Sequence, residues 1–165
     1  HGLRKVQADP HPGNFMVDDE RNLVAIDFGC MKSIPEDFYH PYFELSKKEN
    51  IEDVVRFDAL LRELEILIPS DSEEEVIYFT ALFQRMMRLF TLPFHDTRFD
   101  FSSSEFWESI STLSRDFAGD SQLRKMNGNR GSKHFIYINR TFFGLYHLLH
   151  DLKAEIHTEA FKQYL

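Results

Sequence analysis

Three polar side chains near the start of the chain have the types and spacing that phosphoryl transfer requires. Asp9 and Asn14 form the pattern D-x-x-x-x-N, and Asp27 begins an Asp-Phe-Gly triplet. In such enzymes one carboxylate orients or deprotonates the attacking hydroxyl, while an amide and a second carboxylate hold Mg²⁺ against the nucleotide phosphates. The pattern therefore predicts Asp9 as the catalytic residue, and Asn14 and Asp27 as ligands of the Mg²⁺ that accompanies ATP.

The segment that carries Asp9 is predicted to be a loop. Asp9 and His11 each precede a proline, and a residue before proline is pushed away from helical backbone geometry. Gly13 permits a tight bend. A purely structural interpretation, in which Asp9 only caps a turn, does not account for the Asp-Phe-Gly triplet that follows.

A β-hairpin is predicted between the two motifs. Residues 15–17 and 23–26 are short apolar runs, and the five residues between them form turns readily. Opposite residues of paired antiparallel strands lie about 5 Å apart. The hairpin is therefore expected to bring Asn14 and Asp27, which flank it, close together.

The rest of the chain is predicted to be mainly helical, because its apolar residues recur at intervals of three and four. The expected helices cover about 35–48, 51–68, 70–90, 103–117, 133–152 and 155 onward, with a loop at 91–101 and a flexible turn at 127–132. Ser70 and Glu73 are expected to form a capping box. The predicted fold class is mostly α (α+β), with a catalytic loop and a β-hairpin followed by about six helices in a single domain, residues 1–165.

Composition limits the class of protein. The chain has 165 residues, of which 42% are hydrophobic, including 17 Phe, and this is enough for the core of one globular domain. It has 19 basic and 27 acidic residues and a net charge of −8. This charge has the wrong sign for attraction to phosphate backbones, so no nucleic-acid partner is expected.

The single cysteine, Cys30, cannot form an internal disulfide, which favours a reducing compartment such as the cytoplasm or an organellar matrix. The apolar region 135–149 is interrupted by Asn139, Arg140 and His147, and is too short and too polar to span a bilayer. Any membrane contact is therefore expected to be peripheral. Arg140, inside this otherwise apolar segment, is predicted to form an ion pair with a carboxylate.

The loop at 9–14 (DPHPGN) and the apolar run at 23–26 that leads into Asp27-Phe28-Gly29 together resemble the UbiB (aarF-domain) family of atypical kinase-like proteins. A weaker similarity extends over 135–156. The resemblance implies the C-terminal lobe of a protein-kinase-like domain, with Asp9 as the catalytic-loop aspartate and Asn14 and Asp27 as metal ligands. It also implies a nucleotide partner, and ATP hydrolysis or phosphorylation of a small-molecule or lipid-linked substrate in ubiquinone or isoprenoid-lipid metabolism.

Other parts of the family's active site are not identified in this chain. These are the small-residue-rich loop over the phosphates, a strand lysine, its glutamate partner and a lysine-and-glutamine motif. The chain is therefore expected to be a C-terminal-lobe fragment that binds nucleotide weakly and has no turnover alone. Only five residues separate Gly29 from Pro35, which leaves no room for a long activation segment and disfavours a protein substrate.

Two other functions remain open. The first is a pseudokinase, or a protein or membrane interaction module, in which the acidic residues are vestigial; the complete set of Asp9, Asn14 and Asp27 argues against it. The second is a small-molecule phosphotransferase of the aminoglycoside or choline type, which has a similar H-x-D-x-x-x-x-N loop. Gln7 stands where those enzymes have His, and the intact Asp-Phe-Gly triplet also favours the UbiB resemblance.

Overall fold

The computed structural model describes residues 2–119 and 131–164, and this part of the chain contains six α-helices and three small antiparallel sheets. The helices are α1 (Glu36–Leu45), α2 (Lys48–Glu52), α3 (Val54–Glu63), α4 (Glu73–Thr91), α5 (Ser104–Gly119) and α7 (His134–Asp151). Three 3₁₀ turns accompany them: η1 (Pro12–Asn14), η2 (Leu92–Phe94) and η3 (Glu159–Tyr164). The predicted fold class, mostly α with small β elements, is confirmed.

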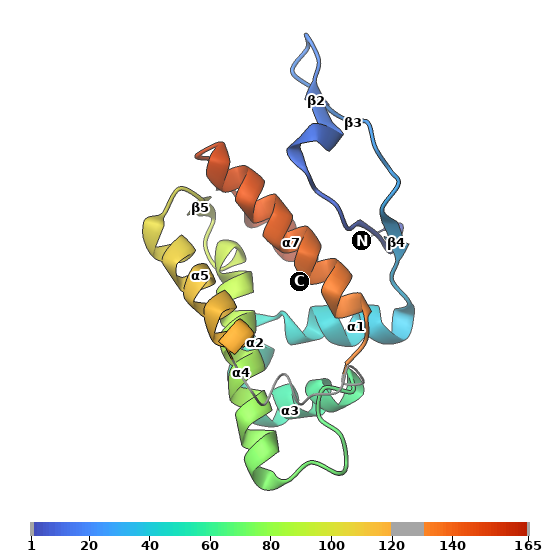
Figure 1. Ribbon diagram of the computed structural model, residues 1–165, viewed down its shortest axis with the longest axis vertical. Helices are drawn as coiled ribbons and strands as arrows, with labels where there is room; N and C mark the ends of the chain where they lie inside the picture. Colours follow the sequence, from blue (N-terminus) through green and yellow to red (C-terminus); the bar gives the residue numbers. More distant parts are fainter. Residues whose placement is uncertain (1, 120–130, 165) are drawn as a thin grey trace.

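The predicted hairpin is formed by β2 (Phe15–Val17) and β3 (Leu23–Ala25), and it projects away from the helices in Figure 1. Asp18 closes its turn by accepting hydrogen bonds from the backbone N–H groups of Glu20 and Asn22 at 3.0 and 2.7 Å. A further bond from the Asn22 side chain helps to hold the pKa of Asp18 below its ordinary value. The turn is therefore fixed by local polar contacts.

A second sheet, which the sequence analysis did not predict, pairs β1 (Lys5–Gln7) with β4 (Met31–Ser33). Gln7 lies opposite Met31, and the Ala8 N–H donates to the Cys30 carbonyl at 3.0 Å. The loop that begins at Ala8 and the Asp-Phe-Gly segment that ends at Gly29 therefore emerge side by side from one end of this sheet.

The helix predicted over 51–68 is interrupted near its start: its first residues belong to the end of α2, and α3 forms most of the rest. The two helices are separated at Asp53, whose carboxylate accepts the backbone N–H groups of Val55 and Arg56, both at 3.0 Å. An aspartate that caps a new helix in this way ends the preceding one. The expected boundaries were therefore wrong: α3 ends at Glu63, and residues 64–68 are not helical.

The capping box of α4 lies two residues later than expected. Ser72, rather than Ser70, accepts the Glu75 N–H through its hydroxyl at 3.3 Å, and Glu75 accepts the Ser72 N–H at 2.9 Å. Because several acidic residues follow both serines, the sequence pattern could not distinguish the two registers.

The third sheet corrects two predictions. The segment 91–101, expected to be a loop, contains η2 and β5 (Arg98–Asp100), and the segment from 155, expected to be helical, begins with β6 (Glu155–His157) and continues as η3. Strands of three residues have little local pattern, and their pairing is decided by tertiary contact. Of the predicted flexible turn, residues 127–130 lie outside the described part of the chain.

Helix α7 runs diagonally between the N-terminal strands and the other helices in Figure 1, and it contributes Phe135, Ile138 and Tyr146 to the core. Near its start Phe135 contacts Phe38 and Tyr42 of α1 edge to face, at ring-centroid distances of 4.9 and 5.4 Å. Further along, Tyr146 packs against Phe101 and Phe106. None of the described helices is long and apolar enough to cross a membrane.

Candidate active site

Asp9 and Asn14 are in direct contact. The Asn14 side-chain amide donates to the Asp9 carbonyl at 2.8 Å and lies 3.5 Å from Asp9 Oδ2. His11 caps the intervening turn η1, because its Nδ1 accepts the Gly13 N–H at 3.0 Å. The predicted loop is thus confirmed, and it forms a turn in which the Asp9 carboxylate faces the Asn14 side-chain amide.

Asp27 lies close by, at the end of the hairpin. The Ile26 N–H donates to the Asn14 carbonyl at 2.9 Å, so Asp27 follows directly after the residue that pairs with Asn14. Asp27 is exposed, and its Oδ1 accepts the Gly29 N–H at 2.7 Å. The hairpin therefore brings the Asn14 and Asp27 segments together.

Gln7 links the two motifs through its side chain. Its Nε2 donates to the Asp27 carbonyl at 2.7 Å, and its Oε1 accepts the Asp9 N–H at 3.2 Å. The orientation of the amide follows from the partners, because a carbonyl needs a donor and an N–H needs an acceptor. Gln7 therefore fixes the start of the catalytic loop relative to the Asp-Phe-Gly segment.

Arg140 of α7 forms an ion pair with Asp9, with Nη2 at 3.1 Å from Oδ1. This confirms the prediction that Arg140 has a carboxylate partner. The pair is not buried, since the two side chains are 62% and 45% exposed, and it faces the solvent above the loop. The two Asp9 oxygens thus differ: Oδ1 contacts Arg140, and Oδ2 faces Asn14.

Two further contacts hold the loop against the same face of α7. The Thr141 hydroxyl lies within hydrogen-bond distance of the Gln7 carbonyl, at 3.0 Å. Gly144 lies against Pro10. Position 144 lies three residues after 141 and four after 140, and these spacings place side chains on one side of a helix, so α7 forms the support on which the catalytic loop rests.

The oxygen atoms of this site fit a Mg²⁺ ion. Within the described residues, Asn14 Oδ1 and Asp27 Oδ2 accept no hydrogen bond, and amide and carboxylate oxygens are the hard ligands that Mg²⁺ prefers. No group of three or more His, Cys, Asp or Glu in the described part of the chain could hold a metal ion. Two oxygen ligands from the chain would leave the other coordination positions of such an ion to phosphate oxygens and water.

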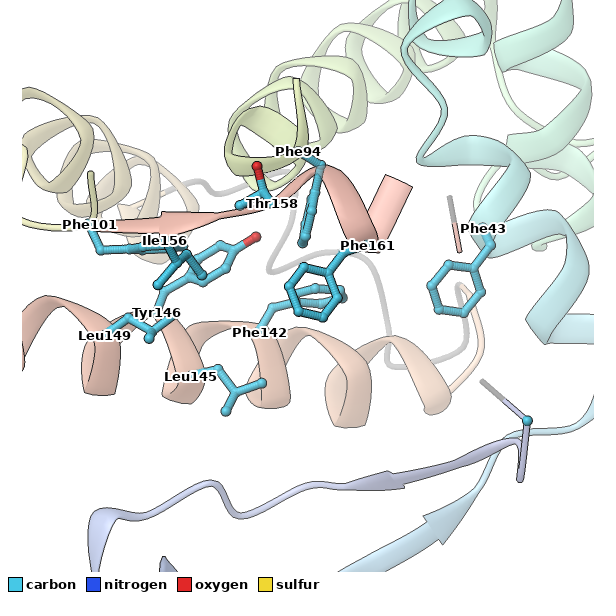
Figure 2. Close-up of a pocket in the computed structure, with 11 residues that line it drawn as sticks. Phe43, Phe94, Phe101, Phe142, Leu145, Tyr146, Leu149, Ile156, Thr158 and Phe161 are labelled. Carbon is cyan, nitrogen blue, oxygen red and sulfur yellow. The ribbon is translucent and has the colours of Figure 1, made fainter. Parts of the chain in front are cut away.

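The opposite side of α7 faces an apolar cavity of about 430 Å³ (Figure 2). Its walls come mainly from α7, η2, β6 and η3, and the residues that line it include Phe94, Phe142, Leu145, Leu149, Ile156 and Phe161. Thr158 and Tyr146 bond their hydroxyls to backbone carbonyls. The cavity contains none of the predicted site residues, and α7 separates it from the catalytic loop.

Residues 2–57 match the family model of the ABC1 atypical kinase-like domain. The match covers the loop at 9–14, the hairpin and the Asp-Phe-Gly segment, and it ends within α3. The prediction of a UbiB (aarF-domain) kinase-like protein is thereby confirmed over these residues, which include Asp9, Asn14 and Asp27. A search of curated proteins found no match to the chain.

Gln7 and Arg140 contact the predicted site residues, but the sequence did not predict them as part of the site. In the sequence, Gln7 was notable only because related enzymes have a histidine at this position. In the structure, its side chain bonds to the backbone of both Asp9 and Asp27. Arg140 lies outside the ABC1 segment, 131 residues from its partner. Its need for a carboxylate was visible in the sequence, whereas the identity of that carboxylate depends on the packing of α7.

Proposed function

We propose that the chain is the catalytic C-terminal lobe of a Mg-ATP-dependent kinase or ATPase of UbiB type. The observation that carries this proposal is the connected set formed by Asp9, Asn14 and Asp27 within the ABC1 segment. Asn14 bonds directly to Asp9, and Gln7 bridges Asp9 to Asp27. A vestigial site has no chemical need for the complete set or for the bridge.

The three residues have different roles in this proposal. Asn14 Oδ1 and Asp27 Oδ2 hold Mg²⁺, which when bound neutralises the phosphate charge. Asp9 orients the acceptor hydroxyl, or a water molecule in an ATPase, and takes its proton. Oδ2 is the atom suited to this step, because Oδ1 contacts Arg140 at 3.1 Å, whereas Oδ2 has only the longer contact of 3.5 Å with the Asn14 amide. The chain's own contribution is therefore mainly positioning and charge.

The exposed hairpin supports the proposal that another lobe completes the active site. Met16, Leu23, Ile26 and Phe28 are large apolar side chains of the hairpin and the Asp-Phe-Gly segment, and all are more than half exposed. A two-stranded hairpin is only marginally stable without a packing partner, and exposed apolar patches usually mark interaction surfaces. We infer that an N-terminal lobe covers this surface, and that the 165-residue chain alone binds nucleotide weakly without turnover.

The short connection after Asp27 supports a small acceptor. Gly29 and Cys30 form a turn, β4 then pairs with β1, and α1 begins at Glu36. The segment that presents peptides in typical protein kinases has no counterpart in this stretch. The proposed acceptor is a small-molecule or lipid-linked substrate of ubiquinone or isoprenoid-lipid metabolism, in the cytoplasm or an organellar matrix, with peripheral membrane contact.

Mg²⁺-dependent ATP binding by the full-length protein tests the metal site. Asp27→Asn is expected to weaken binding about tenfold or more, because it removes a carboxylate ligand. Asp100→Asn is a matched control, since Asp100 also accepts the backbone N–H of the residue two positions later but lies on β5. Equal binding by Asp27→Asn and the parent would show that Asp27 is not a ligand.

Turnover separates the enzyme from a pseudokinase. Asp9→Asn in the full-length protein is expected to lower phosphate release or transfer at least ~100-fold while nucleotide binding is largely kept. A parent protein that binds Mg-ATP but has no turnover with any small or lipid-linked acceptor would favour the pseudokinase. Robust phosphate release by the isolated 165 residues would contradict the proposed need for a second lobe.

A further inference from the structure

The catalytic loop lacks a cation of its own. Residues 9–14 contain neither Lys nor Arg, although the charge on a transferred phosphoryl group is usually neutralised by basic side chains as well as by metal ions. Among the described residues, Arg140 of α7 is the one that forms an ion pair with Asp9. A guanidinium group therefore lies beside the group that would face the reacting phosphate.

Most of this guanidinium remains free to bind another anion. Its contact with Asp9 uses Nη2 alone, at 3.1 Å from one carboxylate oxygen. An arginine has five N–H donors in a planar fork, which matches the spacing of phosphate oxygens. Because the side chain is 62% exposed, a ligand in the site can reach the remaining donors without displacing protein atoms.

The helix beneath Arg140 is fixed relative to the loop. Thr141 contacts the Gln7 carbonyl, and Gly144 lies against Pro10, so α7 touches the loop at two points besides the ion pair.

Arg98 is a comparable arginine that lies away from the site. It forms an ion pair of similar length and exposure with Glu155, at 3.0 Å, but the pair joins β5 to β6 and has no link to the site.

We propose that Arg140 is a phosphate-binding residue whose free N–H groups bind the terminal phosphate of the nucleotide while Nη2 holds Asp9. The inference rests on the proposed function and deepens it, since it names the residue that supplies positive charge to the site. It also assigns α7, outside the ABC1 segment, a direct contact with the ligand.

The test compares two ligands of the full-length protein, a non-hydrolysable ATP analogue and ADP, each with Mg²⁺, by titration calorimetry. Arg140→Gln is expected to weaken binding of the analogue about tenfold or more and binding of ADP by less than about twofold, because ADP lacks the terminal phosphate. Arg140→Lys keeps the charge but not the fork, and should show an intermediate loss.

Two variants provide controls. Arg98→Gln removes a similar exposed ion pair away from the site and should change neither affinity. Thr141→Val loosens the support of the loop without changing charge, and should affect both nucleotides alike. Thermal denaturation of each variant verifies that it is folded.

Equal losses for the analogue and ADP in Arg140→Gln, or no loss for either, would overturn the assignment and leave Arg140 as a structural partner of Asp9. A parent protein that binds neither ligand would instead refute the proposed function, and this inference with it. Nucleotide binding by the parent protein therefore distinguishes a failure of this inference from a failure of the proposed function.

Discussion

Gly144 of α7 and Pro10 of the catalytic loop are so close that no side chain fits between them. A Cβ atom at position 144 would lie 2.3 Å from Pro10 Cγ and 3.1 Å from its Cδ. The proline ring is rigid and buried, so it cannot move aside as a flexible side chain would. Glycine is required at this position for close approach, and not for an unusual backbone angle.

Gly144→Ala is therefore expected to destabilise the protein by about 1–3 kcal/mol through overpacking. The sign of this change in folding free energy is informative, because a Gly-to-Ala substitution at a helix position with free space around it is neutral or stabilising, by up to ~1 kcal/mol. Gly119→Ala, at the end of α5 with nothing within 4 Å of the added atom, is the matched control. Chemical denaturation of both variants measures the difference; a stabilised Gly144→Ala would mean that the loop does not rest on α7.

Gln7→Met should weaken Mg-ATP binding by the full-length protein about five- to tenfold, since it removes both hydrogen bonds that connect Asp9 and Asp27, each contributing about 1 kcal/mol. Gln84→Met is the control, because Gln84 also donates to a backbone carbonyl, that of Ile51, remote from the site. The control should lose stability without losing affinity. Unchanged affinity in Gln7→Met would mean that the bridge does not position the site.

Tyr146→Phe is expected to cost about 1–3 kcal/mol of folding free energy. The Tyr146 hydroxyl donates to the Phe90 carbonyl at 2.7 Å in the core, and its removal leaves a buried carbonyl without a partner. Tyr137→Phe on the same helix removes a hydroxyl with no hydrogen bond to the described residues, and should change stability by less than ~0.5 kcal/mol. Similar urea midpoints for the two variants would refute the role of the Tyr146 bond.

His134 should make folding stability depend on pH. Burial lowers the pKa of its imidazole, and the neighbouring Lys133 acts in the same direction. The folded state therefore binds this proton less tightly than the unfolded chain, whose histidine pKa is near 6.5, and stability rises as pH increases through that value.

The measurement is the difference in melting temperature between pH 5 and pH 7. His134→Phe keeps an aromatic ring next to Phe38, which the imidazole contacts at 5.5 Å, but has no proton to lose. Its melting temperature should vary less over this interval than that of the parent. The same dependence in both proteins would show that His134 does not titrate differently on folding.

The parts of the fold that were predicted correctly have strong local patterns. The β2–β3 hairpin followed from two apolar runs around a polar turn, and α4, α5 and α7 followed from their apolar periodicity. The β1–β4 and β5–β6 sheets were missed because each strand has three residues and its partner lies far along the chain. The break at Asp53 was missed because the apolar pattern continues across it.

The candidate site was also predictable only in part. Asp9, Asn14 and Asp27 could be identified from residue type and spacing, since phosphoryl transfer restricts both. The contacts that hold them could not, because they join segments whose relation is set by packing: Gln7, at the end of β1, reaches the Asp27 carbonyl, and Thr141 reaches the Gln7 backbone from α7.

The long separation in sequence between the catalytic loop and α7 has a consequence for biosynthesis. A ribosome that has just translated α4 has already released Asp9, Asn14 and Asp27, but has not yet made the helix that contacts Asp9 and Pro10. Since domains fold as their contacts become available during synthesis, the candidate active site is expected to remain unformed until α7 has left the ribosome. Nascent chains that stop before His134 should therefore expose the catalytic loop to proteases and chaperones.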